Sequence, residues 1–291
     1  MNTSNSVAFV ATKPLQIMTS INLAQQLALA GASLTVVPYF AAADAIVQRL
    51  GRAGFGVPAI RTAPTRIAAL FDLAATGATR IYLDRDMGMR TTLALRWLRV
   101  TRPRVRYSLY EEGISLFEPA EAERPSRLSA LLGATLTLGE GPFTDEVWTY
   151  DPDRLRARLP AKPLHAITTP LSAFVEQHRA GLLEVFWPAY ERDVRQWRGG
   201  TCCIYLSSWE VDARALEYVT ATSAFKVFKP HPHMRGDIAA PQGFDHVLDA
   251  AIPAELVLLE MARLFDEVIV VHVDSSTARY VSAGNVRFVD A

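Results

Sequence analysis

Cysteine and lysine are scarce in this sequence, and neither sign of charge is in excess. The two cysteines among the 291 residues, Cys202 and Cys203, are adjacent and therefore poorly placed to form a disulfide with each other. A disulfide-dense secreted scaffold is excluded, and a reducing, cytoplasmic location is expected. The 30 basic residues, 26 of them arginine, balance 30 acidic ones. A net charge of zero argues against a dedicated nucleic-acid-binding protein, which needs a basic surface.

The sequence also lacks a segment typical of a membrane span or a secretory signal. No charged residue occurs between Lys13 and Asp44, but Gln16 and Asn22 interrupt this stretch and Gly31 divides it, so it belongs inside a fold. The first six residues carry no positive charge. A G-x-S-x-G elbow and a Walker A loop are missing, and residues 139–141 lack the third glycine of a dinucleotide fingerprint.

Half of the residues are hydrophobic, and they recur in a regular pattern. Short apolar runs alternate with helix-length amphipathic segments, which is typical of βαβ units with a mostly parallel sheet. The predicted strands are Val7–Ala11, 34–37, 80–84, 105–110, 202–206, 225–228, 268–271 and 286–289. The predicted helices are one ending near residue 31, then 44–50, 67–75, 91–100, 170–186, 213–220, Ala254–Leu264 and 277–282.

This pattern indicates two α/β halves of similar size. The alternation loosens between residues 114 and 164, where glycine and proline are frequent, and the domain junction is expected there. We predict an α/β chain with two Rossmann-like, doubly wound domains, 1–160 and 161–291, facing each other across a cleft. Ligands bind such sheets at the carboxyl ends of the strands. Reactive side chains follow the predicted strands at Asp84, Asp86, Glu111, Glu112, Ser207, Ser208, 229–233 and 274–276.

Two adjacent carboxylates follow the predicted strand at 105–110. Glu111 and Glu112 precede Gly113, which lets the backbone turn sharply out of the sheet. Like charges in a partly desolvated place raise the pKa of one carboxyl toward neutrality, as a general base for a hydroxyl requires. The alternative is a solvated turn, because this tripeptide is common.

A histidine held between prolines follows the predicted strand at 225–228. In residues 229–233 (KPHPH), Pro230 and Pro232 restrict the backbone on both sides of His231. An imidazole held in this way suits a departing phosphate. A loop with solvated histidines is the alternative. His231 and His233 also suggest a metal, but no further ligands stand at zinc-like spacing, so no metal is assigned.

Hydroxyl side chains follow the predicted strand at 268–271. Asp274, Ser275, Ser276 and Thr277 would open the next helix, where free N–H groups and hydroxyls bind phosphate. An ordinary helix cap is the alternative. Asp84 and Asp86 match the D-x-D string of metal-dependent glycosyltransferases, but a chance match and an acceptor contact both remain open.

Taken in order, three of these motifs resemble a known family. YEEG at 110–113, KPHP at 229–232 and the serine pair Ser275–Ser276 resemble the signatures of bacterial sialyltransferases. The likeness is strongest to the lipooligosaccharide sialyltransferases of glycosyltransferase family 52, and the bacterial polysialyltransferases are similar in the same motifs. Residues 11–16 (ATKPLQ) also resemble the first strand-to-helix turn of that group.

The resemblance implies the GT-B fold and an inverting, metal-independent transfer of sialic acid from CMP-sialic acid to a sugar hydroxyl of a cell-surface glycan. Domain 1–160 would take the acceptor and domain 161–291 the CMP donor. By motif, Glu111 becomes the base, supported by Glu112 and Gly113. His231, within the HP pair with Pro232, would protonate or neutralise the phosphate of departing CMP. The remaining implied donor-binding residues are Lys229, Glu255 (at the cytidine ribose), Ser275 and Ser276.

Two alternatives to this function stay open. Related capsule enzymes carry an HP signature, so the transferred sugar is equally open: it could be Kdo or another CMP-activated nonulosonate. A homologue that binds nucleotide without catalysis is the second alternative. The chain is shorter than these enzymes usually are, which leaves the acceptor open. The arginines between Arg96 and Arg106 form either a solvated helix end or a peripheral contact with an anionic membrane such as the inner membrane.

Overall fold

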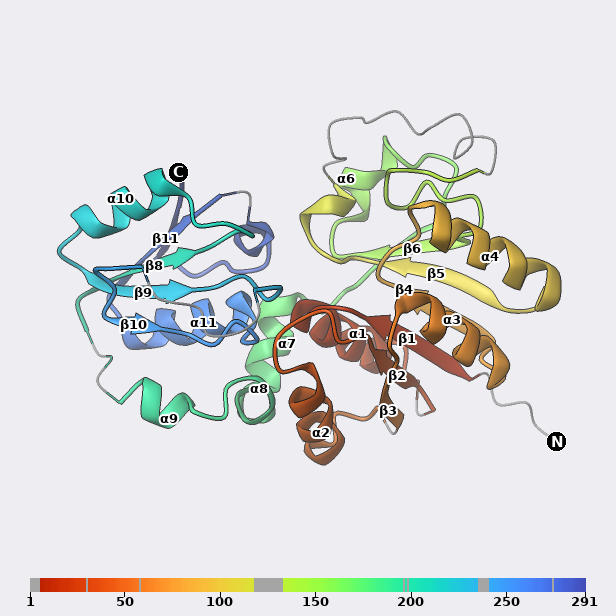
Figure 1. Cartoon of the computed structure of the whole chain (residues 1–291), viewed down its shortest axis with the longest axis horizontal. Coiled ribbons are helices and arrows are strands. Elements are labelled where there is room, and N and C mark those ends of the chain that lie inside the picture. Colours follow the sequence, from red (N-terminus) through yellow and green to blue (C-terminus); the bar gives the residue numbers. More distant parts are fainter. Residues whose placement is uncertain are drawn as a thin grey trace. The chain divides into compact units, whose positions relative to one another are not determined.

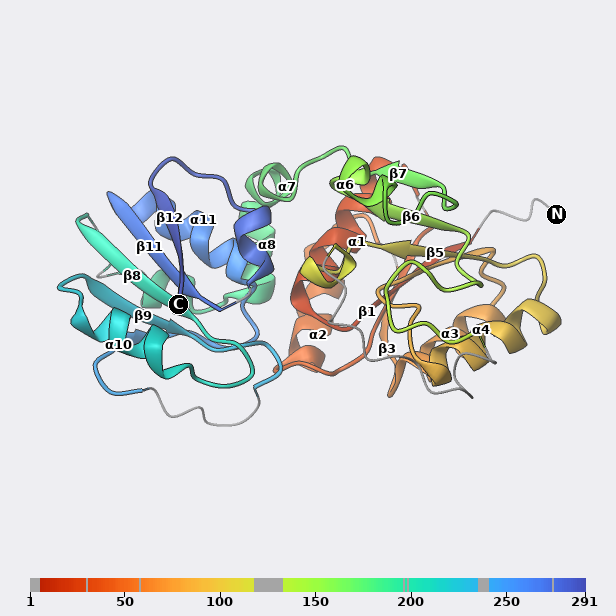
Figure 2. The same cartoon turned by 90° about the horizontal axis from the view of Figure 1, so that it is seen from above.

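A computed structural model describes residues 6–29, 31–57, 59–117, 133–195, 197, 199–234, 241–273 and 275–291. It contains two sheets of parallel strands and divides into two compact units (Figures 1 and 2). Unit 1 comprises residues 1–38 and 50–170, and unit 2 comprises residues 39–49 and 171–291.

Unit 1 is built on a seven-stranded sheet in the order β3-β2-β1-β4-β5-β6-β7. Its strands are β1 (Val7–Ala11), β2 (Ser33–Val36), β3 (Ala59–Thr62), β4 (Arg80–Leu83), β5 (Arg106–Tyr110), β6 (Glu146–Thr149) and β7 (Leu164–Ala166). Its helices are α1 (Pro14–Gln26), the end of α2 (Ala43–Ala53), α3 (Arg66–Ala75), α4 (Met89–Thr101), the 3-10 turn η1 (Ile114–Leu116) and α6 (Pro152–Arg156).

Unit 2 is built on a five-stranded sheet in the order β10-β9-β8-β11-β12. Its strands are β8 (Thr201–Leu206), β9 (Phe225–Lys229), β10 (His246–Val247), β11 (Glu267–His272) and β12 (Val286–Asp290). Its helices are α7 (Leu171–Gln177), α8 (Arg179–Phe186), α9 (Tyr190–Asp193), α10 (Ala213–Ala221), α11 (Ala254–Leu264) and the 3-10 turn η2 (Ser276–Arg279).

The core of unit 1 explains why the central strands are apolar throughout. All five residues of β1 are buried because both faces of the strand are covered. On one face, Ala8 and Val10 join a cluster with α3 and α4 that includes Leu70 and Leu95. On the other face, Phe9 stacks on Tyr82 with ring centroids 4.6 Å apart. The burial of these side chains on both faces is the main force that holds the sheet together.

In each sheet the strand order reverses at one point: successive strands are added to one side of the first strand, and later strands to its other side. In unit 1 this point lies between β1 and β4, and in unit 2 between β8 and β11. In open parallel sheets, the loops that leave two such strands run to opposite faces, and ligands bind in the crevice between them. In unit 1 the residues that follow these two strands are Thr12 and Asp84. In unit 2 they include Ser207 and Val273.

The predicted fold class, an α/β chain with two Rossmann-like domains, is confirmed. All eight predicted strands occur, and β3, β6, β7 and β10 are additional. The single helix expected over 170–186 is divided at His178 into α7 and α8. The helix expected over 277–282 is instead the 3-10 turn η2. Both cysteines are buried and free.

The unit boundary differs in detail from the predicted division after residue 160. The glycine- and proline-rich stretch leads into β6, and β6 pairs in parallel with both β5 and β7, so the first sheet extends through Ala166. Residues 39–49 belong to unit 2, where Ala41 N–H donates to Pro232 O at 3.1 Å. Arg49 Nε donates to Val185 O at 2.6 Å.

No helix within the described residues has both the length and the apolar composition that crossing a membrane requires.

Gly141 gives a test of how tightly the loops of unit 1 pack. A Cβ at this position would lie 2.6 Å from Asp86 Oδ2, inside the contact distance of a buried carboxylate. We expect Gly141→Ala to lower the free energy of unfolding by about 1–3 kcal/mol, as overpacking does. The measurement is urea denaturation. Gly51→Ala is the matched control, because a Cβ there meets no atom within 4 Å and alanine favours the helix. Equal stability of the two variants would contradict the expectation.

Candidate active site

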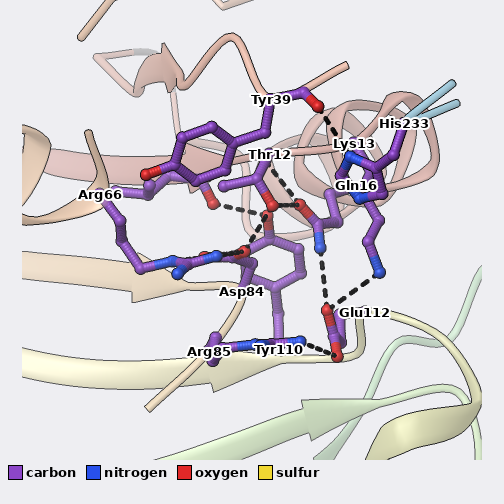
Figure 3. A network of polar contacts seen from close by, with 11 residues as sticks. Thr12, Lys13, Gln16, Tyr39, Arg66, Asp84, Arg85, Tyr110, Glu112 and His233 are labelled. Atoms are coloured by element: carbon purple, nitrogen blue, oxygen red, sulfur yellow. Dashed lines mark hydrogen bonds and ion pairs between the residues drawn. The ribbon is translucent and has the colours of Figure 1, made fainter. Parts of the chain in front are cut away.

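Asp84 lies at the centre of a polar network at the carboxyl edge of unit 1 (Figure 3). It follows β4 and is fully buried. Arg66 donates to both of its carboxylate oxygens, at 2.8 and 2.7 Å, and the Thr12 hydroxyl donates to Oδ2 at 2.8 Å. Because a buried carboxylate is costly unless it is paired and hydrogen-bonded, these donors compensate for the burial of Asp84.

The network continues through the start of α1 to Glu112. Gln16 accepts a hydrogen bond from Thr12 N–H at 2.6 Å, and its Nε2 donates to Glu112 Oε2 at 3.1 Å. Lys13 Nζ lies 3.5 Å from the same oxygen, and an Arg85 nitrogen lies 3.7 Å from Oε1. The buried Glu112 carboxylate is therefore held by two cations and one amide (Figure 3).

Glu111 is directed away from these groups, toward β6. Its Oε2 accepts hydrogen bonds from the Thr149 hydroxyl at 2.6 Å and from Tyr150 N–H at 2.8 Å. The side chain is buried, although it follows Tyr110 at the strand end. Gly113 has a φ of 133°, a backbone conformation that favours glycine, which fits the predicted sharp turn. The two neighbouring carboxylates thus have separate sets of donors.

The second aspartate of the D-x-D string is engaged within its own loops. Asp86 accepts hydrogen bonds from Gly139 N–H at 2.9 Å, Gly141 N–H at 3.2 Å and the Thr144 hydroxyl at 2.8 Å. Its role in the structure is to join the loop after β4 to the segment before β6. Over the part of the chain that the structure describes, no group of three His, Cys, Asp or Glu side chains could hold a metal ion.

In unit 2, Lys229 at the end of β9 is buried. Its Nζ donates to Pro230 O at 2.6 Å and to Ala250 O at 3.0 Å. Burial lowers the pKa of Lys229 to about 7, against a partial opposing effect of Asp249 and Glu255. The lysine therefore joins the KPHP turn to the loop after β10.

His231 and His233 share a ring cluster with Trp209. Trp209 is 67% exposed and stacks on His233 with centroids 4.6 Å apart, while its centroid lies 5.1 Å from that of His231. His233 N–H donates to His231 Nδ1 at 3.2 Å, which leaves the proton of neutral His231 on Nε2. His233 Nδ1 donates in turn to Tyr39 O at 2.7 Å (Figure 3). The orientation of the His231 ring is thus set by its neighbours.

A chain of hydroxyls follows β11. The Ser275 hydroxyl donates to Thr277 Oγ1 at 3.0 Å, and Thr277 Oγ1 donates to Glu255 Oε1 at 3.2 Å. Glu255 is buried in the first turn of α11, and burial raises its pKa. Ser276, the first residue of η2, is half-buried. Asp274 lies outside the described residues.

The structure brings the expected residues together in two groups, one in each unit. Glu111, Glu112 and Gly113 lie at the edge of the first sheet, and His231, Pro232, Lys229, Ser275, Ser276 and Glu255 lie in loops or at element ends around the second. Sequence reasoning did not single out Arg66, Thr149 or Trp209. The one available signal was Trp209, an aromatic residue just after the strand-end serines.

No protein-family model matches the sequence, and no curated protein matches it either. Among solved structures, the chain is similar to Glycyrrhiza uralensis UGT73P12 complexed with glycyrrhetinic acid 3-O-monoglucuronide. The TM-score is 0.52, at 11% identity over 92% of this chain and 73% of that one. At this identity the similarity establishes the fold alone: the chain has the two-domain GT-B fold.

Two further solved structures resemble the chain less closely. The UDP-GlcNAc 2-epimerase from Neisseria meningitidis bound to UDP-GlcNAc has a TM-score of 0.49, at 11% identity over 98% of this chain and 87% of that one. Spinosyn rhamnosyltransferase SpnG complexed with thymidine diphosphate has a TM-score of 0.45, at 12% identity over 94% and 77%. The likeness to the sialyltransferases of family 52 stays a prediction.

The buried lysine predicts a pH dependence of stability. The pKa of Lys229 is about 7 in the folded chain and near 10.5 in the unfolded one. At a pH between these two values, Lys229 therefore carries a proton in the unfolded chain that it has largely lost in the folded chain. The free energy of unfolding should therefore rise with pH above 7, by at most about 1.4 kcal/mol per pH unit from this group. Urea denaturation from pH 7 to 9 measures it, with Lys229→Met as the reference that lacks the group. Parallel pH curves for the two proteins would rule the effect out.

Proposed function

We propose that this protein is an inverting glycosyltransferase that moves sialic acid from CMP-sialic acid to a sugar hydroxyl of a cell-surface glycan. The observation that supports the proposal most is the fixed orientation of His231, whose Nδ1 accepts a backbone N–H and whose Nε2 therefore carries the donor proton. A donor N–H at the end of a parallel strand suits a phosphate that gains charge as it leaves. The GT-B fold is compatible with this chemistry.

In the proposed reaction, the acceptor oxygen forms a bond to the anomeric carbon while the bond from that carbon to the CMP phosphate oxygen breaks. Glu111 takes the proton from the acceptor hydroxyl. CMP leaves with the electron pair, and the neutral His231 stabilises the new phosphate charge by donating a hydrogen bond from Nε2–H. In this proposal the reaction uses no metal ion.

The remaining residues position these two groups. Thr149 and Tyr150 N–H hold one carboxylate oxygen of Glu111, which fixes the direction of the side chain. Glu112, held by Lys13 and Arg85, supports the turn that carries Glu111. In unit 2, Lys229 fixes the KPHP turn, and Ser275 and Ser276 bind the donor phosphate. Glu255 orients Ser275 through Thr277 and contacts the cytidine ribose of the donor.

Selective binding of cytidine nucleotides is the first consequence. We expect CMP to raise the unfolding temperature, while UMP, UDP and GDP at the same concentration do not. Ligand at about 100 times its dissociation constant adds roughly 2.7 kcal/mol to the free energy of unfolding, which thermal unfolding detects. Stabilisation by UDP or GDP alone would overturn the proposed donor. If CMP binds, CMP-sialic acid and CMP-Kdo are then compared as donors.

The role of Glu111 predicts a separation of binding from transfer. Glu111→Gln should keep the CMP-induced stabilisation and lose acceptor-dependent CMP release by about 10²-fold or more, because a general base contributes 10²–10⁴. Glu184→Gln, an exposed site on α8, is the matched control and should behave as wild type. Full transfer by Glu111→Gln would remove Glu111 as the base. If the wild-type protein binds CMP but no CMP is released from CMP-sialic acid or CMP-Kdo in the presence of acceptor, the chain is a nucleotide-binding homologue without transferase activity.

A further inference from the structure

Helix α4 exposes large apolar side chains on its outer face. Leu93, Trp97 and Val100 are 42%, 59% and 76% exposed, and their spacing of four and three residues places them in one stripe. On the inner face, Ala94, Leu95 and Leu98 pack into the core of unit 1. The outer face of a surface helix is normally polar, so a contiguous apolar stripe marks a surface with a partner.

Positive charge surrounds this stripe. Residues 89–106 contain six arginines and no acidic residue. Arg99 is engaged within the unit, where it lies 2.5 Å from Asp145 and donates to Phe143 O. The other five arginines are exposed, and none of them forms an ion pair with another described residue: Arg90, Arg96, Arg102, Arg104 and Arg106.

A pocket of about 390 Å³ lies just beyond the end of α4. It opens where β1, β4 and β5 begin, and Arg80, Arg104 and Arg106 are among its lining residues. The Arg80 guanidinium lies 3.3 Å from Glu146, so the charge of Arg80 is partly balanced, whereas that of Arg104 and Arg106 is not. The pocket is therefore cationic and large enough for a phosphate-bearing headgroup. The pocket lies at the amino ends of these strands, whereas Asp84 and Glu112 come after the carboxyl ends of β4 and β5.

We propose that this surface, called the α4 face (Leu93, Trp97, Val100, Arg96, Arg102, Arg104 and Arg106), docks on an anionic lipid bilayer. Tryptophan is favoured at the membrane interface, where its ring and the aliphatic side chains enter the boundary of the acyl region. The arginines bind the lipid phosphates, and one phosphate enters the pocket beside Arg104 and Arg106.

Other partners fit the α4 face less well. A second copy of the same face would bring its arginines against identical arginines and is disfavoured by repulsion. A nucleic acid would meet the arginines but leave Leu93 and Val100 without apolar contacts. An anionic bilayer offers both the negative charge and the apolar layer. This proposal does not depend on the donor or on catalysis.

Flotation of the full chain with lipid vesicles tests the α4 face. We expect binding to phosphatidylcholine vesicles that contain phosphatidylglycerol, little binding to pure phosphatidylcholine, and loss of binding at high salt. Each arginine near the surface contributes roughly fivefold in partition coefficient, so the double change Arg104→Ala and Arg106→Ala should lower binding by about 25-fold. Trp97→Ser should lower it independently, through the apolar contact.

The control is the exposed face of α10, which also carries an arginine and an aromatic residue. Arg214→Ala with Tyr218→Ala should bind vesicles as wild type does. The proposal fails if wild type does not float with anionic vesicles, if it floats equally with neutral ones, or if both α4-face variants bind as wild type. If light scattering shows that the wild-type protein is an oligomer and that Trp97→Ser dissociates it, the stripe is a protein–protein contact instead. Unchanged thermal unfolding confirms that each variant is folded.

Discussion

The organisation of unit 1 depends on the compensation of buried carboxylates at the carboxyl edge of its sheet. Asp84 is fully buried, and Arg66 and the Thr12 hydroxyl compensate for the loss of water around its carboxylate. The same requirement at Glu112 draws in the first turn of α1 through Gln16. Together these contacts fix the ends of β1, β4 and β5 against one another. The apolar core below can form with many side chains, but this edge demands particular ones.

Unit 2 holds its loops by other means. Lys229 donates to two backbone carbonyls, and Asp249 and Glu255 favour its charged form. Prolines and stacked rings then restrict His231. The two units therefore position the loops at their strand ends with different kinds of contact.

The sequence predicted the central strands well because they are apolar on both faces, as in β1, β8 and β11. It did not reveal β6, which starts with Glu146 and follows a glycine- and proline-rich stretch, nor β10, which has only two residues. Short, polar-edged strands owe their existence to a neighbour with which they pair, and a single sequence does not display that neighbour.

The candidate site shows the same limit. Motifs singled out Glu111 and His231 because each follows a strand of the sheet in its own unit, and ligands bind open parallel sheets at the carboxyl ends of the strands. The partners that orient them, such as Thr149 and Trp209, come from other strands or loops, and no local spacing links them. The fold was therefore accessible from periodicity, while the geometry of each side chain required the folded chain.

Residues 39–49 have a consequence for how the chain acquires its structure. They belong to unit 2 but are synthesised long before the rest of it, and they hold its loops through Tyr39, Ala41 and Arg49. The second unit is thus discontinuous along the chain. A fragment that starts at residue 171 would lack the Tyr39 backbone oxygen that accepts a hydrogen bond from His233. During synthesis, the second unit therefore cannot fold from a continuous C-terminal segment alone.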